Sequence, residues 1–262
     1  MRVVGRDWLN ASSIVLLQPG CNVVADTGYV SHAQQTLALL RRPEHLGSES
    51  LQPVANTHCH SDHMGSNALL MRTYGCPVAV PEGEAALIRN WDKHALWLDF
   101  ADQRAERFTA DAELAGSRRY CWDGFSWEAI VAPGHDMGAL AFYCEATGLL
   151  ISGDALYEHA FGVVLPGQPD ALKASRATLN RIATLNVRVV IPGRGRPFTG
   201  VATALERCYH RVDAFQAEPV RMRSRASTVA AQHAASLFGR CRGVSGIQPN
   251  VLWRPRCLRK HW

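Results

Sequence analysis

The sequence lacks the features that would place the chain in a membrane or in the secretory route. No run of 18 or more apolar residues occurs, which excludes a membrane-spanning helix. Arg2 and Arg6 lie near the start, but Asp7 interrupts them and no small-residue cleavage site follows an apolar segment, so no secretory signal is predicted. The sequence therefore predicts a cytoplasmic protein without a membrane partner.

Paired cysteines and internal repeats are also missing. None of the eight cysteines forms a C-x-x-C pair, and a chain of 262 residues does not need disulfide staples to fold. Buried free thiols in a reducing compartment are the expected state. With 47% hydrophobic and 19% charged residues, the composition is that of a globular protein rather than a disordered or fibrous one.

Acidic residues are absent from one end of the chain. Residues 220–262 hold nine basic side chains and no acidic one, whereas residues 1–219 hold 19 basic and 23 acidic side chains. Because the sequence shows neither an aromatic-interleaved basic groove nor an RNA-binding signature, we expect a solvated extension and no specific nucleic-acid partner. The predicted organisation is a single domain over residues 1–239, followed by an irregular basic tail over residues 240–262.

Hydrophobic periodicity predicts alternating strands and helices. The expected strands cover residues 12–17, 22–25, 52–56, 77–80, 125–131, 139–144, 149–152 and 187–191. The expected helices cover residues 31–42 (with Ser31 as N-cap), 66–74, 82–91, 170–185, 200–216 and 226–238. Residues 92–115 show no clean period. Two mixed sheets with helices outside them would satisfy this order.

The most informative segment places three histidines and an aspartate within six residues. It reads Thr57-His-Cys-His-Ser-Asp-His63 and lies between an expected strand and an expected helix. In an extended segment, His58 and His60 project to the same side, while Asp62 and His63 follow where the chain turns. Neutral imidazole and carboxylate ligands suit zinc, iron or manganese. This segment therefore predicts part of a metal site, to be completed by ligands from elsewhere.

Two further elements end strands with residues that bind metals. His135 lies in the loop Ala-Pro-Gly-His-Asp-Met-Gly after the strand 125–131, and Asp154 follows the apolar strand 149–152. Taken alone, the histidine is more typical of a structural loop, and the aspartate of a turn or helix cap. Together with the His58–His63 segment, they indicate ligands that converge from several strand ends.

With these motifs in this order, residues 10–215 of the chain resemble the metallo-β-lactamase-fold hydrolase superfamily, which includes glyoxalase II-type thioesterases, lactonases and true β-lactamases. The resemblance rests on H-x-H-x-D-H, the P-G-H loop, the G-D strand end and a late P-G-x-G segment. It implies an α+β fold, an αββα sandwich of two mixed β-sheets with outer helices and with the metals at one edge.

The resemblance also implies a ligand set. His58, His60 and His135 would hold a first metal, Asp62 and His63 would belong to a second, and Asp154 would bridge the two. Asp154 at the bridging position resembles the glyoxalase II and lactonase branches more than true β-lactamases. Asp26, in a D-T-G turn, is either a support behind the ligands or a plain turn residue. Loops 92–115 and 155–168 would border the substrate, with aromatic residues such as Trp91 and Tyr157.

One residue departs from the family pattern. The late segment reads Pro192-Gly-Arg-Gly195, with Arg194 where the family has its last histidine ligand. A guanidinium stays protonated and offers no lone pair to a cation, so Arg194 would instead pair with Asp62 or Asp154. His159 or His210 would be the substitutes, although their spacing does not argue for either.

The expected function is a metal-dependent hydrolase of an ester, lactone or thioester that uses a metal-bound hydroxide. Asp62 would be the catalytic proton acceptor or orienting group, and the expected cofactor is one tightly bound zinc with a weakened second site, iron or manganese being alternatives. Two other hypotheses stay open: a mononuclear iron enzyme similar to the superfamily's dioxygenases, and a binding protein whose catalysis Arg194 has impaired. The partner is a small-molecule substrate, and the sequence does not indicate an oligomeric state.

Overall fold

Two β-sheets lie face to face, with helices covering each outer face. The computed structural model describes residues 1–6, 10–164, 168, 170–222, 224 and 228. In these residues the strands are β1 (Arg2–Val4), β2 (Ser13–Leu16), β3 (Val23–Ala25), β4 (Val54–Ala55), β5 (Val78–Pro81), β6 (Ala112–Leu114), β7 (Arg119–Trp122), β8 (Phe125–Val131), β9 (Leu140–Cys144), β10 (Leu149–Gly153) and β11 (Val189–Pro192). The helices are η1 (Val30–His32), α1 (Ala33–Leu40), α2 (Ser61–Met64), α3 (Asn67–Tyr74), α4 (Glu82–Asn90), η2 (Phe100–Asp102), α5 (Ala171–Ala183) and α6 (Val201–Ala217).

The first sheet has the order β1-β2-β3-β4-β5-β6 among the described residues. The turn at Pro19-Gly20 joins β2 and β3 into the predicted antiparallel hairpin, with Ile14 opposite Ala25. From β3 onward the pairs are parallel, because a helical segment returns the chain to the same end before each of β4 and β5. Their carboxyl ends therefore lie at one edge.

The second sheet has the order β11-β10-β9-β8-β7. β8, β9 and β10 form a meander, joined between β9 and β10 by the predicted turn, and α5 carries the chain across to β11 as a parallel neighbour of β10. Because β9 is antiparallel to both of its neighbours, β8, β10 and β11 all run in one direction. Their carboxyl ends also share an edge.

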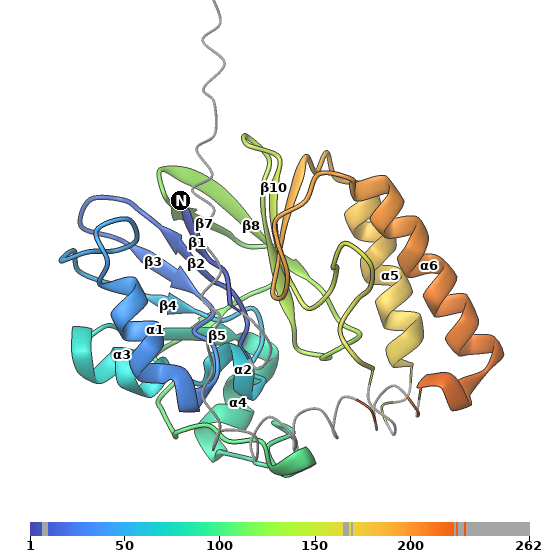
Figure 1. Cartoon of the computed structure of the whole chain (residues 1–262), viewed down its shortest axis with the longest axis horizontal. Coiled ribbons are helices and arrows are strands. Elements are labelled where there is room, and N and C mark those ends of the chain that lie inside the picture. Colours follow the sequence, from blue (N-terminus) through green and yellow to red (C-terminus); the bar gives the residue numbers. More distant parts are fainter. Residues whose placement is uncertain (7–9, 165–167, 169, 223, 225–227, 229–262) are drawn as a thin grey trace, which may run out of the picture.

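Three apolar layers hold these elements together. One layer lies between the first sheet and α1, α3 and α4, a second between the two sheets, and a third between the second sheet and α5 and α6. Figure 1 shows the same arrangement, with α5 and α6 on one side and α1, α3 and α4 on the other. The predicted αββα sandwich of two mixed sheets is confirmed.

Several element boundaries differ from the sequence prediction. The helix expected from Ser31 begins at Ala33, because η1 occupies residues 30–32, and Ser31 is not its N-cap. β1, β6 and β7 were not predicted; they are only three or four residues long, so no alternation shows. The expected helix over residues 226–238 falls almost wholly outside the described residues, and the predicted tail over residues 240–262 lies outside them.

Candidate metal centre

Every predicted site residue follows the carboxyl end of a strand. Asp26 comes directly after β3, the segment from His58 to His63 comes after β4, and His135, Asp154 and Arg194 come after β8, β10 and β11. The short helix α2 carries Asp62 and His63. Because these strand ends meet where the two sheets face each other, residues far apart in the chain come together.

Three imidazoles converge at this edge. His60 Nδ1 lies 2.9 Å from His135 Nε2, and the ring centroid of His58 lies 4.6 Å from that of His60 and 5.2 Å from that of His135. One nitrogen from each ring fits within a span of 4.8 Å. These are the three histidines that the resemblance assigns to the first metal.

A second group shares His58 with the first and adds His63 and Asp154, again with ligand atoms within 4.8 Å. Asp154 Oδ1 lies 3.1 Å from His63 Nε2, while its Oδ2 lies 3.4 Å from His135 Nε2. The carboxylate thus presents one oxygen to each group. This placement is the one that a bridging ligand requires.

The buried ring nitrogens and the Asp154 carboxylate of the site are suited to binding a metal ion. His58 Nε2, His60 Nε2, His63 Nε2 and Asp154 Oδ1 are buried and make no well-aligned hydrogen bond. The last two lie 3.1 Å apart, and His60 Nε2 lies 3.4 Å from Asp136 Oδ2, so His58 Nε2 has the least contact with a carboxylate. Buried polar atoms are almost always paired, so several unpaired lone-pair donors in one place need an explanation. A cation bound by imidazole nitrogens and a carboxylate supplies one, and zinc, iron and manganese accept such ligands.

Asp26 is hydrogen-bonded to the segment that carries the potential ligands, as the interpretation of a support would require. Its carboxylate accepts hydrogen bonds from Thr57 N at 2.9 Å, from Thr57 Oγ1 at 2.8 Å and from His63 Nδ1 at 2.8 Å. The bond to Nδ1 turns His63 Nε2 toward Asp154. On the other side, His135 Nδ1 donates to the Val163 carbonyl at 2.6 Å, which likewise fixes its ring.

Arg194 pairs with Asp62, one of the two partners predicted for it. Arg194 Nη2 donates to Asp62 Oδ2 at 2.7 Å, and the same oxygen lies 3.3 Å from His63 Nε2. Among the described residues, Asp62 belongs to neither of the two groups of potential ligands. The Arg194 guanidinium therefore lies beside His63 and Asp62 at the edge of the second group.

Burial and the neighbouring charges together lower the pKa values of three residues of the site. Burial and the neighbouring His63 and His60 hold the pKa of His58 well below its usual range, so this imidazole is neutral and able to bind a cation. Burial alone would raise the pKa of Asp62, but Arg194 and His63 outweigh it and lower the pKa. Burial would also raise the pKa of Asp154, and His63, His135 and Arg194 outweigh it in the same way.

Two residues near the site were missed by sequence reasoning. Asp136 Oδ2 lies 3.4 Å from His60 Nε2, and the buried Glu84 on α4 accepts hydrogen bonds from Cys59 N at 2.9 and 3.0 Å. The position of Asp136 next to His135 in the sequence could have indicated its place near the site. The sequence around Glu84 is instead typical of an exposed carboxylate on a helix. Tyr157, expected at the border of the substrate, interacts with Asp154 and Arg194.

The alternative ligands His159 and His210 lie away from the centre. Both are exposed; His159 contacts Arg207, and His210 is on α6. Neither belongs to a group of potential ligands in the described part of the chain. No described helix is long and apolar enough to cross a membrane.

Known proteins resemble the chain in sequence and in structure. A family model described as the metallo-beta-lactamase superfamily matches residues 6–194. A probable metallo-hydrolase of Methanocaldococcus jannaschii is 26% identical over 162 residues, which cover 60% of this chain and 76% of that protein. A hydroxyacylglutathione hydrolase of Idiomarina loihiensis is 24% identical over 160 residues, 61% of this chain but only 51% of that protein. The crystal structure of a metallo-beta-lactamase family protein from Thermus thermophilus has a TM-score of 0.66 at 23% identity and covers 90% of this chain and 92% of that one.

Proposed function

Since the chain belongs to the metallo-beta-lactamase superfamily and is a metallo-hydrolase, we propose that it hydrolyses a carboxylic ester, a lactone or a thioester. The observation that carries this proposal is the convergence of His58, His60 and His135, in which Nε2 of His58 and Nε2 of His60 are buried without a hydrogen-bond partner. The hydroxyacylglutathione hydrolase among its relatives acts, by its name, on a hydroxyacylglutathione, and Asp154 between the two groups agrees with the glyoxalase II branch.

In this proposal the three imidazoles hold one zinc ion, with iron or manganese as the other ions that the ligands accept. A metal held by these residues would supply a water molecule of lowered pKa and would polarise the substrate carbonyl. His63 and Asp154 contribute a second, weaker position next to Arg194. Three protein ligands leave room for water, so one metal suffices for hydrolysis.

We assign Asp62 an orienting role in catalysis. Arg194 and His63 outweigh its burial and lower the pKa of its carboxyl, which makes the carboxylate a weak base at neutral pH. The same contacts fix its oxygens 2.7 Å from Arg194 Nη2 and 3.3 Å from His63 Nε2. A fixed, ionised carboxylate accepts a hydrogen bond from the attacking water and directs its lone pair at the carbonyl.

Metal analysis combined with a substrate panel tests the function. The purified chain is assayed against aryl esters, lactones, thioesters and a chromogenic β-lactam, before and after metal removal by a chelator. We expect about one metal per chain, activity on at least one ester-type substrate, and loss of at least ~100-fold on chelation or in His58→Ala. His210→Ala, which removes an exposed histidine on α6, is the control. Activity that survives metal removal contradicts the proposal.

A second candidate function follows from the contact between Arg194 and Asp62. If this ion pair blocks the second position completely, the chain binds substrate-like molecules without turning them over. Retained binding of one metal with no turnover of any substrate in the panel would identify this case. Iron content together with oxygen consumption would identify the mononuclear iron enzyme instead.

The six described cysteines are free, which supports a cytoplasmic location.

A further inference from the structure

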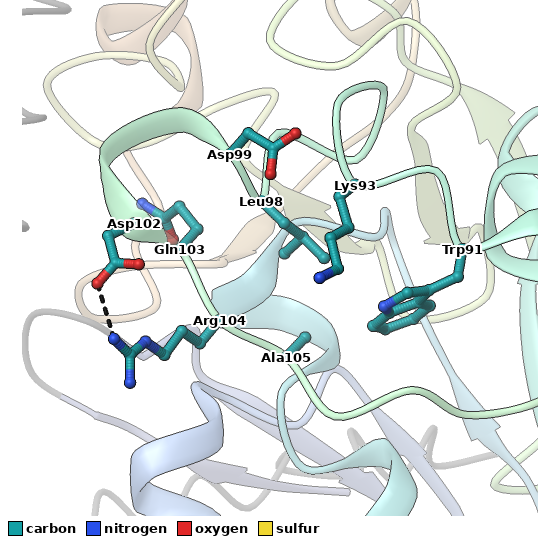
Figure 2. Close-up of a pocket in the computed structure, with 8 residues that line it drawn as sticks. All are labelled: Trp91, Lys93, Leu98, Asp99, Asp102, Gln103, Arg104 and Ala105. Carbon is teal, nitrogen blue, oxygen red and sulfur yellow. Dashed lines mark hydrogen bonds and ion pairs between the residues drawn. The ribbon is translucent and has the colours of Figure 1, made fainter.

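A pocket of about 600 Å³ lies in the segment between α4 and β6. Its size is within the range of small-molecule sites. Eight residues of this segment line the pocket, and Figure 2 shows their side chains: Trp91, Lys93, Leu98, Asp99, Asp102, Gln103, Arg104 and Ala105. None of them belongs to the two groups of potential metal ligands.

The pocket adjoins the metal centre through direct contacts. The hydroxyl of Ser61, which lies between His60 and Asp62 in the chain, donates a hydrogen bond to Gln103 Oε1. One residue further, Arg104 N donates to the hydroxyl of the buried Tyr29 at 3.1 Å. The wall of the pocket is therefore attached to the segment that carries the metal ligands.

The pocket segment keeps an unfavourable backbone conformation. Trp91, Trp97 and Asp102 have φ values of 52°, 58° and 52°, in the left-handed region that residues with a side chain rarely adopt. Strained residues of this kind persist only where surrounding contacts hold them, and they cluster at binding sites. The segment thus has a feature that is typical of a place where a ligand binds.

The charges of the pocket are not all satisfied by the protein. Arg104 Nη2 lies 2.9 Å from Asp102 Oδ2, so these two offset each other. Lys93 and Asp99 make no ion pair within the described residues. In Figure 2 the Lys93 amine lies between Leu98 and the indole of Trp91. Lys93 and Asp99 are both exposed. At the end of the pocket next to Trp91 and Leu98, the Lys93 charge attracts an anion and repels a cation.

We propose that this pocket binds the carboxylate-bearing part of the substrate, with the carboxylate on Lys93 and the adjoining apolar carbons on Trp91 and Leu98. The bond to be cleaved then extends past Gln103 toward the metal centre. As a statement about substrate, this rests on the proposed hydrolase function; as a statement about binding, it is tested independently of turnover.

The binding test compares two molecules of the same shape, 3-phenylpropionate and its uncharged amide. Binding to the full chain is followed by NMR titration, reading the indole N–H resonance of Trp91, which is assigned with Trp91→Phe. We expect the carboxylate to bind about fivefold more tightly than the amide, as one partly exposed ion pair allows. Equal binding of the two, or a Trp91 resonance that does not shift, overturns the proposal.

Three variants test the assignment of charge. Lys93→Gln should reduce the preference for the carboxylate to within twofold, and Asp99→Asn should tighten its binding, because a repulsive charge is removed. Lys173→Gln, which removes an exposed lysine on α5, should change nothing. Weaker binding of the carboxylate to Asp99→Asn would indicate a site for cations and contradict the proposal.

A kinetic comparison separates the pocket from the hydrolase function. The 4-nitrophenyl half-ester of adipic acid and 4-nitrophenyl hexanoate share a leaving group and differ in a terminal carboxylate. In Lys93→Gln we expect KM for the half-ester to rise about fivefold with kcat unchanged, and KM for the hexanoate to stay within twofold. If neither ester is cleaved but 3-phenylpropionate binds, the result supports the assignment of the pocket and contradicts the proposed ester hydrolysis. If both are cleaved and Lys93→Gln has no effect, hydrolysis stands and the pocket assignment fails.

Discussion

At residue 194, a permanent positive charge lies beside ligands that would otherwise attract a second cation. Arg194 is bonded to Asp62, and its charge also contributes to lowering the pKa of Asp154. Two unit charges 4 Å apart interact by about 4 kcal/mol at an effective dielectric constant near 20, and by about twice that when one ion is divalent. Under the proposed function, we expect repulsion of this size, added to one missing ligand, to weaken a second metal position strongly.

The first prediction is that Arg194→His raises the metal content from about one per chain toward two and increases turnover. The imidazole restores a ligand and removes the opposing charge. Elemental analysis after dialysis measures the stoichiometry, and Arg188→His, which places a histidine at an exposed position away from the centre, serves as the control. Two tightly held metals in the unmodified chain would show that another residue completes the second position.

Glu84 gives a second residue-scale prediction, this time on stability. Burial, reinforced by the nearby Asp136, raises the pKa of Glu84 well above its usual range. The folded chain therefore keeps a proton that the unfolded chain releases above about pH 4.3, so this residue lowers stability as the pH rises from there to its folded-state pKa. Glu84→Gln removes that loss and keeps an oxygen for Cys59 N.

We therefore expect metal-free Glu84→Gln to melt at a higher temperature than the unmodified metal-free chain at pH 8, with a smaller difference at pH 5. Each kcal/mol corresponds to about 2–4 °C in a chain of this size. Thermal unfolding at the two pH values measures the effect, and Glu206→Gln on the exposed face of α6 should show no pH-dependent gain. A difference that is larger at pH 5 would contradict this account.

At the scale of the elements, the short helix α2 packs closely against the chain that follows β3. It carries Asp62 and His63 and ends against the chain after β3, where Gly65 N donates to the Gly28 carbonyl at 2.8 Å. A Cβ added at Gly65 would lie 2.6 Å from that carbonyl oxygen, which belongs to the backbone and cannot move aside. Glycine at this position lets α2 approach β3 and bring His63 to Asp26.

Accordingly, Gly65→Ala should destabilise the fold by about 1–3 kcal/mol, the cost of overpacking, and should weaken metal binding at the same time. Thermal unfolding and metal titration measure the two effects. Gly5→Ala is the matched control, because a Cβ there meets no atom within 4 Å. If the two variants behave alike, the close approach of α2 is not what positions Asp62 and His63.

On the scale of the whole molecule, the site depends on two sheets that present their strand ends to each other. His58 and His63 come from the first sheet, and His135 and Asp154 come from the second. Neither sheet alone holds either of the two groups of potential ligands.

Deleting residues 240–262 should leave metal binding and hydrolysis within a few-fold of the full chain. The segment lacks periodic apolar positions and follows the region matched by the family model, which ends at residue 194. Metal content and the rate on the best substrate of the panel measure the outcome. A truncated chain that does not fold, or that loses all activity, would show that the tail contacts the rest of the domain near the site.

The sequence by itself determined what depends on neighbours along the chain. Strands such as β8 and β9 and helices such as α5 follow from their own hydrophobic period, and the segment from His58 to His63 indicates a metal site because its residues lie so close together in the chain. The family resemblance extended this to His135, Asp154 and the anomaly at Arg194.

Only the tertiary structure decided which of these residues meet. Asp62 and Arg194 are 132 residues apart and the rings of His60 and His135 are 75 apart, and such contacts depend on strand order and on the packing of two sheets, which no local pattern encodes. Burial is decided in the same way. Glu84 reads as a solvated helical carboxylate, and it becomes a buried partner of Cys59 only because α4 packs against the loop that carries the ligands.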